Sequence, residues 1–462
     1  MSDLRFIIGL IIGVILLITM VAKTKIHAFP ALILSAIITG LIGGMDTTAI
    51  VKAITGGFGN TLSSIGIIIG FGVMMGQIFE LSGAAETMAL TFIKIFGKKR
   101  EHIALAITGW VVSIPIFCDS GFILLSPIAK AISKKTSKSI FVLGYSLAVG
   151  LLISHHMILP TPGPLAATVN YGADLGQSIL MGIIFCIPML IGTLIYTNYV
   201  GSKIYQIPSD DGGWIREEKP NKKAEEDFEL KPSRDDLPNA FLSFLPILLP
   251  IILILLGTVL GTVLGNIFKS ADKSNAIISA INFVGNPVIA VGIGLLISIF
   301  TLTNKMSRNE TLKVMELGIT GCGVILLVTG AGGSFGQILK DSGVANSIAE
   351  FIASTKIPAI LIPFVIATVV RFIVGSGTVA IVTSSSICAP LLNQLGINPT
   401  LGTMASCSGA MFFSYFNDSY FWVINRTLGV EDIKEQIRHW SINTTIGWAI
   451  GLITLLIFDI FI

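Results

Sequence analysis

The chain has 462 residues, of which 53% are hydrophobic and only 12% are charged, and its mean hydropathy is +0.84. A soluble core of this length cannot hide so much apolar surface, so the composition excludes a soluble globular protein and predicts one that crosses the membrane several times. The net charge of +3 is too small to indicate a nucleic-acid partner.

Continuous apolar runs favour membrane-spanning α-helices over a β-barrel, whose strands would alternate in polarity. We predict ten spans, which lie near 6–22, 28–45, 61–80, 140–175 (interrupted), 177–200, 240–266, 281–303, 314–337, 398–425 (interrupted) and 440–460. Residues 84–97 are too short to span and mildly amphipathic, which predicts a helix along the membrane interface. The polar stretch 202–239 is typical of a flexible cytoplasmic linker between an N-terminal half, 1–201, and a C-terminal half, 240–462.

Two further apolar segments, 103–133 and 357–392, are each divided into halves that are too short to cross the bilayer. The dividing pairs are Ser120-Gly121 in the first segment and Ser376-Gly377 in the second. We therefore predict that each segment is a re-entrant hairpin, which enters and leaves the membrane on one side.

A short motif occurs once before each hairpin. GQIFELSGAAE begins at Gly76 and GQILKDSGVAN begins at Gly336, and the two copies agree at six of eleven positions. This correspondence predicts two related halves, each with one hairpin and one broken helix. The four predicted breaks are CDSG at 118–121, HHMILPTPGP at 155–164, GSGT at 375–378 and YFNDS at 415–419.

The basic residues predict opposite orientations for the two hairpins. Those around the first hairpin are Lys94, Lys98, Lys99, Arg100, Lys130, Lys134, Lys135 and Lys138, whereas those outside the second are Lys340 and Lys356. By the positive-inside rule the first hairpin opens to the cytoplasm and the second to the other face. The halves are then inverted repeats, and both termini lie on the non-cytoplasmic side.

The breaks are candidates for a binding site near the membrane midplane. A helix that restarts after a break presents free N–H groups and the positive end of its dipole, which suit a carboxylate. We expect the helices restarting after Gly121 and Gly377 to converge on such an anion. The candidate substrate-binding residues are Asp119, Ser120, Gly121, Thr161, Pro162, Gly163, Arg371, Ser376, Gly377, Thr378, Asn417, Asp418 and Ser419.

Several of these residues have a structural alternative. Asp119 is either a helix cap or a group that binds substrate hydroxyls or a proton. His155 and His156 are either proton carriers or packing residues. Arg371 pairs either with the substrate carboxylate or with Asp418 or Asp119. The proline-rich TPGP segment is either part of the site or a kink, and the Asn417-Asp418-Ser419 segment either binds hydroxyls or caps a helix. The proton-coupling candidates are Asp119, His155, His156 and Asp418.

Other patterns do not indicate enzyme chemistry. GAGGSFG at 330–336 lacks the lysine of a nucleotide-binding loop and lies in an apolar run, so it predicts tight helix packing. The histidines show no HExxH pattern, and the five cysteines are not spaced as metal or redox pairs. We expect no metal, no cofactor and no enzymatic activity, and we expect the cysteines to be reduced and buried.

Four motifs resemble those of the gluconate permease (GntP) family of the ion transporter superfamily. They are PIFCDSGFILLSPI at 115–128, SHHMILPTPGPLAATVNYGADLG at 154–176, RFIVGSGTVAIVT at 371–383 and FNDSYFW at 416–422. The resemblance implies proton-coupled uptake of gluconate or a related small hydroxy acid across the bacterial inner membrane. It also implies a homodimer in which a domain that holds both hairpins moves like an elevator. Symport of D-serine or another short hydroxy acid, and exchange of carboxylates, remain alternatives.

Overall fold

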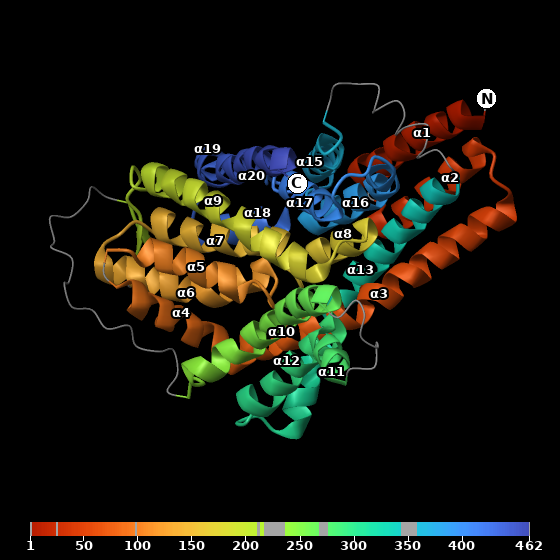
Figure 1. Ribbon diagram of the computed structural model, residues 1–462. Coiled ribbons are helices and arrows are strands. Elements are labelled where there is room, and N and C mark those ends of the chain that lie inside the picture. Colours follow the sequence, from red (N-terminus) through yellow and green to blue (C-terminus); the bar gives the residue numbers. More distant parts are fainter. Residues whose placement is uncertain are drawn as a thin grey trace.

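The computed structural model describes residues 2–24, 26–97, 99–209, 213–216, 236–267, 276–342 and 358–461. Nearly all of this part of the chain is helical (Figure 1). In the first half the helices are α1 (Ser2–Lys23), α2 (Ala28–Gly43), α3 (Thr47–Ser82), α4 (Ala84–Phe96), α5 (Glu101–Val112), α6 (Cys118–Thr136), α7 (Ile140–Met157), α8 (Pro162–Tyr171) and α9 (Leu175–Gly201). This bears out the helical class predicted from the sequence.

A short antiparallel pair, β1 (Ile207–Pro208) and β2 (Trp214–Ile215), follows α9. The second half contains α10 (Ala240–Ile267), α11 (Ala276–Gly285), α12 (Pro287–Leu302), α13 (Arg308–Asp341), α15 (Leu361–Val374), α16 (Gly377–Gln394), α17 (Pro399–Gly409), α18 (Ser419–Thr427), α19 (Ile433–Gln436), a π-helix (Ile437–Ser441) and α20 (Ile442–Phe461). Six spans in the described residues are long and apolar enough to cross a membrane, or seven if the bent pair α11–α12 is one span.

Both hairpin segments and both broken helices are present as helix pairs. α5 and α6 form the first hairpin, and α15 and α16 form the second, whose predicted first residue, 357, lies outside the described residues. The predicted broken helix 140–175 is the pair α7 and α8, and the predicted broken helix 398–425 is the pair α17 and α18.

Two predicted spans have different bounds. The span expected at 61–80 is the end of a 36-residue helix, α3, that begins at Thr47, because the Asp46 carboxylate accepts hydrogen bonds from Thr48 N–H and Ala49 N–H and caps it. The span expected at 281–303 is not continuous. Helices α11 and α12 are bent by 63° at Asn286, which caps the proline-initiated α12.

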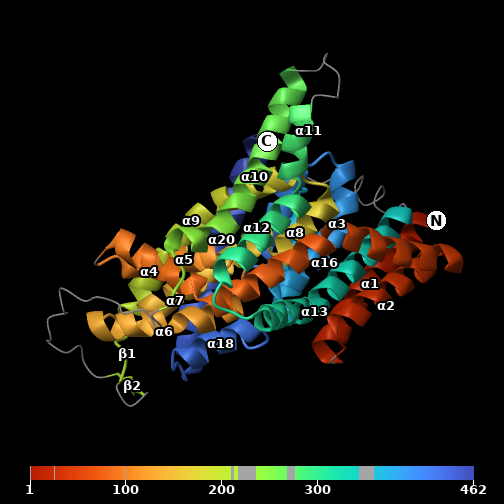
Figure 2. The same ribbon diagram turned by 90° about the horizontal axis from the view of Figure 1, so that it is seen from below.

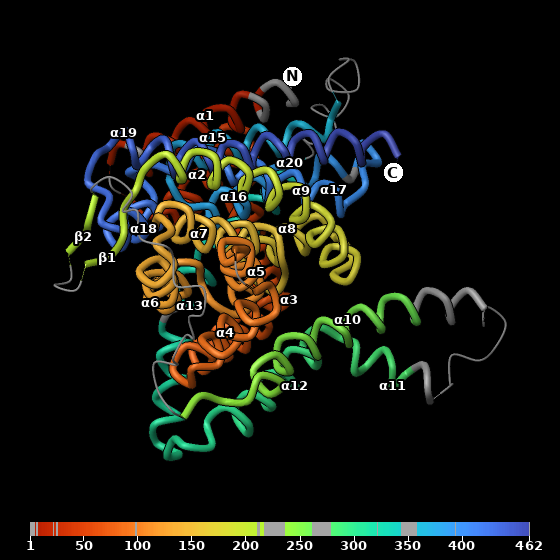
Figure 3. The backbone as a smooth tube through the Cα atoms, turned by 90° about the vertical axis from the view of Figure 1, so that its left-hand side faces the viewer, coloured from red at the N-terminus to blue at the C-terminus, as the bar shows by residue number. Residues whose placement is uncertain are grey.

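The long helices α3 and α13 lie side by side and run in opposite directions (Figures 1 and 2). A Cβ atom at Gly57 would meet the Gly333 carbonyl oxygen at 2.5 Å, and one at Gly318 would meet the Val73 carbonyl oxygen at 2.8 Å. The small residues of GAGGSFG therefore allow close helix packing, as predicted. Helices α10, α11 and α12 lie at one edge of the molecule, where α10 contacts α4 and α9 and α12 contacts α3, while α11 and the end of α10 project away from the other helices (Figure 3).

Helix α7 lies at the centre of the molecule. Every residue from Ile140 to Met157 is buried, because α5, α6, α9 and other helices surround it. A helix that is apolar on all sides is suited to this position. The five cysteines are free and buried, as expected.

The first part of the predicted flexible linker is folded against the second half. The Gln206 side chain is fully buried and donates to the Leu428 carbonyl oxygen at 2.6 Å, and Arg216 forms a 2.7 Å ion pair with Glu435. The sequence prediction was therefore wrong for the described residues of 202–216. Residues 217–235 lie outside the described part of the chain.

Candidate functional site

The structure has four interruptions in its helices close to the predicted positions. They are the elbow of the first hairpin at 113–117, the break between α7 and α8 at 158–161, the elbow of the second hairpin at 375–376, and the break between α17 and α18 at 410–418.

The first elbow lies before the predicted CDSG break. Helix α5 ends at Val112, and α6 already begins at Cys118, so Asp119 and Gly121 lie in its first turn. The Gly121 N–H donates to the Phe117 carbonyl oxygen at 2.9 Å. The prediction that this helix restarts after Gly121 was wrong. Pro115 lacks an N–H group and interrupts the helix ladder earlier in the segment.

The second elbow is formed by Gly375 and Ser376. Gly375 has a left-handed φ of 82° and its N–H closes α15 on the Arg371 carbonyl oxygen at 2.9 Å. Ser376 is the N-cap of α16 and accepts a 3.4 Å hydrogen bond from the Val379 N–H. Helix α16 thus begins at Gly377, within the predicted GSGT break.

Prolines define the break between α7 and α8. His155 and His156 occupy the last turn of α7, and α8 begins at Pro162, so only 158–161 are outside helices. A proline at the first helical position loses no intrahelical hydrogen bond. The Thr161 hydroxyl donates to the Ile158 carbonyl oxygen, so this side chain stabilises the break itself.

The four interruptions are joined by contacts between opposite halves. Ser419, the first residue of α18, donates its hydroxyl to Asp119 Oδ2, in the first turn of α6, over 3.5 Å. The second elbow meets the end of α7 in the same way. His156 Nε2 lies so close to Gly377 that a Cβ atom added to Gly377 would overlap it. A Cβ atom at Gly163 would lie 3.5 Å from Thr378 Cα. Each hairpin elbow therefore packs against the broken helix of the other half.

Arg371 and Asp418 form a buried ion pair, with 3% and 7% of each residue exposed. Arg371 Nη2 lies 2.5 Å from Asp418 Oδ2, and Nη1 donates to the Gly375 carbonyl oxygen. Asp418 also caps α18 by accepting a 3.1 Å hydrogen bond from the Tyr420 N–H. Of the alternatives for Arg371, the structure shows the pair with Asp418.

A network that the sequence did not reveal holds Asp418 in place. The Ser414 hydroxyl donates to Asp418 Oδ2 and accepts a 2.8 Å hydrogen bond from Trp440 Nε1. Ser441 Oγ donates to the Ser414 carbonyl oxygen at 2.5 Å. Trp440 and Ser441 belong to the π-helix, a rare element that often occurs at functional sites. No sequence pattern marks a π-helix, so the sequence did not reveal this network.

Two candidate side chains make no hydrogen bond to the opposite half within the described residues. The Asn417 side-chain amide donates to the carbonyl oxygens of Phe372 and Ile373, at 2.9 and 3.2 Å, so it closes the end of α15. The Ser120 hydroxyl has no hydrogen bond to another residue in the described part of the chain, although it lies in the same turn as Asp119.

Several buried polar atoms near the interruptions have no hydrogen-bond partner among the described residues. They are Asp119 Oδ1, His155 Nδ1, His156 Nε2 and Arg371 Nε. Buried polar groups are nearly always paired, so an unpaired group calls for an explanation such as bound water or a polar ligand. Four of them within one constellation indicate a polar binding region.

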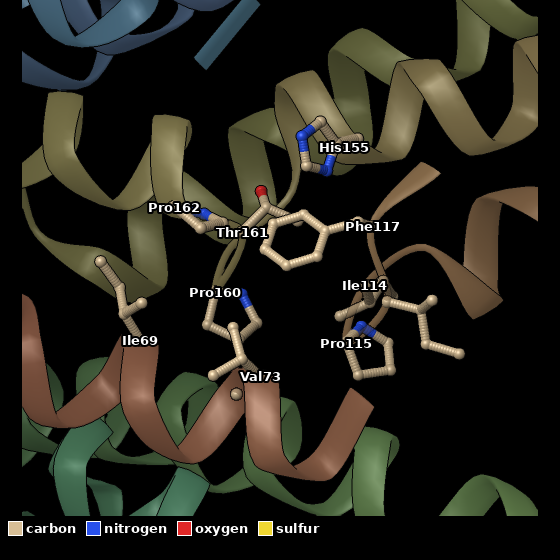
Figure 4. Close-up of a pocket in the computed structure, with 11 residues that line it drawn as sticks. Ile69, Val73, Ile114, Pro115, Phe117, His155, Pro160, Thr161 and Pro162 are labelled. Atoms are coloured by element: carbon tan, nitrogen blue, oxygen red, sulfur yellow. The ribbon is translucent and has the colours of Figure 1, made fainter. Parts of the chain in front are cut away.

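A small pocket opens beside this region, with a volume of about 20 Å³ (Figure 4). Ile69 and Val73 of α3 form one wall, and Phe117 of the first elbow, His155 and Thr161 form the others. The rings of Phe117 and His155 meet edge to face with 5.7 Å between their centroids. The α3 residues were not predicted, because nothing in an apolar helix distinguishes residues that face a site from those that face lipid.

The GntP family permease model matches residues 5–461. The chain belongs to this family. It is 44% identical over 456 residues to an uncharacterized permease of Haemophilus influenzae, which covers 98% of this chain and 91% of that one. It is 32% identical over 460 residues to the high-affinity gluconate transporter of Escherichia coli, with 98% of each chain covered.

The fold is also similar to that of the YdaH transporter of Alcanivorax borkumensis, with a TM-score of 0.65 and 12% identity over 94% of this chain and 98% of that one. Together with the apolar helices, these matches identify this GntP family member as a transporter and not an enzyme, located as a multi-pass protein in the inner membrane. The described residues include no group of three or more His, Cys, Asp or Glu side chains that could hold a metal ion.

Proposed function

We propose that the protein is a secondary active transporter that takes up gluconate, or a related small hydroxy-carboxylate, together with protons. The E. coli relative is named as a gluconate transporter and matches over 98% of its length. The observation that carries the proposal is the meeting of both hairpin elbows with both helix breaks around buried, unpaired polar atoms.

The substrate carboxylate binds at the start of α16. Ser376, Gly377 and Thr378 lie where this 18-residue helix presents its first N–H groups and the positive end of its dipole. Arg371 adds positive charge next to this end, although Asp418 shares its guanidinium group. The first turn of α6, with Ser120 and Gly121, approaches from the other elbow.

The substrate hydroxyls bind to the polar groups on the facing side. Asp119 has an unpaired buried oxygen. Thr161, at the end of the break, and Pro162, the first residue of α8, line the pocket of Figure 4, and Gly163 follows them in α8. Asp119, His155, His156 and Asp418 are the proton-coupling candidates. Asp418 is the least available of them, because Arg371, Ser414 and the Tyr420 N–H already occupy its oxygens.

We further propose two inverted repeats that work as an elevator in a homodimer. The copies of the motif, at Gly76 and Gly336, are 260 residues apart, and the contact of Gly57 with Gly333 has its counterpart in the contact of Gly318 with Val73. This supports an approximate two-fold relation between α3 and α13. The helices around α7, with both hairpins, move against α3 and α13, and the pocket of Figure 4 lies at their boundary.

Uptake into proteoliposomes tests the coupling. With an acidic exterior and an alkaline interior, labelled gluconate should accumulate above its external concentration, and an uncoupler should abolish the accumulation. Uptake that only equilibrates, whatever the pH gradient, would refute symport. Counterflow that does not depend on pH would instead favour an exchanger.

The substrate can be tested separately from transport. Thermal unfolding of the purified protein with C3 to C6 hydroxy acids and with D-serine should show the largest stabilisation with a six-carbon sugar acid. Stabilisation by D-serine alone would reassign the substrate, and no stabilisation by any of these compounds would contradict the proposed class.

A further inference from the structure

A second cavity, of about 610 Å³, shares no lining residue with the proposed transport site. Its walls are the open end of the first hairpin, the start of α7, the end of α9 and the folded segment that contains β1 and β2. By the proposed orientation this cavity faces the cytoplasm, although its chemistry does not depend on that orientation.

The lining of the cavity is strongly basic. Four cationic side chains line it, and no carboxylate does so among the described residues; the cations are Lys99, Lys138, Lys203 and Arg216. Glu101 and Glu435 lie outside the lining and pair with Lys138 and Arg216, respectively.

The other two cations have no carboxylate partner within the described chain. Lys203 Nζ lies 3.8 Å from the centre of the Tyr199 ring, and the side chain of Lys99 is exposed. Two of the four positive charges are thus balanced by carboxylates, and the cavity keeps a net charge of about +2.

Neutral donors complete the lining. Ser137 and Ser202 contribute hydroxyls, and the Tyr205 hydroxyl is buried near Ser137 without a partner at hydrogen-bonding geometry. The 18-residue helix α7 begins at this cavity and adds the positive end of its dipole. Two unpaired lysines beside several hydroxyls suit a phosphate group, whose oxygens accept many hydrogen bonds and carry up to two negative charges.

We propose that this cavity binds a phosphate group, either of an anionic phospholipid or of a soluble phosphorylated molecule. Basic pockets at the ends of membrane helices are suited to lipid headgroups, and a volume of this size also accommodates a sugar monophosphate. The segment that closes the cavity contacts α18 and α19 through Gln206 and Arg216, so an occupied cavity restrains the region that follows Asp418.

The test compares the full-length protein with the double variant Lys99→Gln, Lys203→Gln. Neither side chain belongs to the proposed transport site, and the double variant should retain gluconate transport. The matched control is Lys52→Gln, Lys313→Gln, which removes two exposed lysines from α3 and α13. The probes are inorganic phosphate and glucose 6-phosphate, measured by calorimetry at low salt, and phosphatidylglycerol in phosphatidylcholine nanodiscs, measured by native mass spectrometry.

We expect the double variant to bind the relevant probe at least about tenfold more weakly, and the control to match the wild type. Loss of calorimetric binding indicates a soluble phosphate, and loss of retained phosphatidylglycerol alone indicates a lipid headgroup. Equal binding by wild type and double variant to every probe, or equal losses in both variants, would overturn the proposal. Gluconate should not displace the phosphate probe, which separates this site from the transport site.

Discussion

Arg371 and Asp418 carry opposite charges in an almost completely buried position. Removal of one partner leaves the other charge desolvated and unpaired, whereas removal of both does not. We predict that Arg371→Gln or Asp418→Asn alone lowers the free energy of unfolding in detergent by about 3 to 5 kcal/mol. The double variant should lose clearly less than the sum. Strictly additive losses would show that the two side chains are not energetically coupled.

The space that a side chain at Gly377 would need is occupied by His156. We predict that Gly377→Ala abolishes gluconate uptake, since the methyl group forces the α16 N-terminus and the end of α7 apart. The control is Gly59→Ala on α3, where an added Cβ has no atom within 4 Å. Uptake at the wild-type rate by Gly377→Ala would show that this contact is not needed for transport.

At the level of helices, the π-helix positions the second break through Trp440. We predict that Trp440→Phe reduces uptake severalfold and lowers the free energy of unfolding by about 1 kcal/mol, because Ser414 loses a buried donor. Trp110→Phe is the control, because the Trp110 indole N–H has no partner at hydrogen-bonding geometry among the described residues. If both variants behave alike, Trp440 contributes only apolar packing.

The glycines that begin the two copies of the repeated motif also allow close contacts between helices and elbows. A Cβ atom at Gly76 would overlap the Pro115 carbonyl oxygen of the first elbow, and one at Gly336 would lie 2.9 Å from the Ser386 carbonyl oxygen of α16. Gly76→Ala should therefore lower the thermal unfolding midpoint, whereas Gly70→Ala, with open space around it, should leave it unchanged or raise it. A similar midpoint for both variants would contradict this role.

The hairpins and broken helices could be predicted because glycine and proline interrupt apolar runs visibly. The first elbow was misplaced because the Ser-Gly pair there lies within the first turn of α6, while at the second elbow the pair itself is the turn. The sequence could not decide which partner Arg371 takes, because Asp418 is 47 residues away and only the tertiary structure brings the two together. Trp440 and Ser414 were missed for the same reason, because a hydrogen bond between distant helices leaves no periodic pattern.

At the scale of the whole molecule, the proposed inversion predicts which ends of the hairpins each side of the membrane can reach. A cysteine at Lys134, near the open end of the first hairpin, should react with an impermeant maleimide only from the cytoplasm. A cysteine at Gln394, at the end of α16, should react only from outside. The native cysteines are buried and give little background. Labelling of both positions from the same side would refute the inverted repeats.

The crossed packing of the elbows has a consequence for the history of the chain. Helix α6 contacts α18, and α16 contacts α8, in addition to the contacts that each hairpin makes within its own half, so a protein containing only the first half would lack one of the surfaces on which its hairpin packs. On the proposed inverted-repeat relation, such an ancestor would have needed a second copy of itself, inserted upside down in the same bilayer, to complete one site. Fusion of the two copies would then have fixed their ratio at one to one and allowed each to acquire residues, such as Arg371 in one and the histidine pair in the other, that the other lacks.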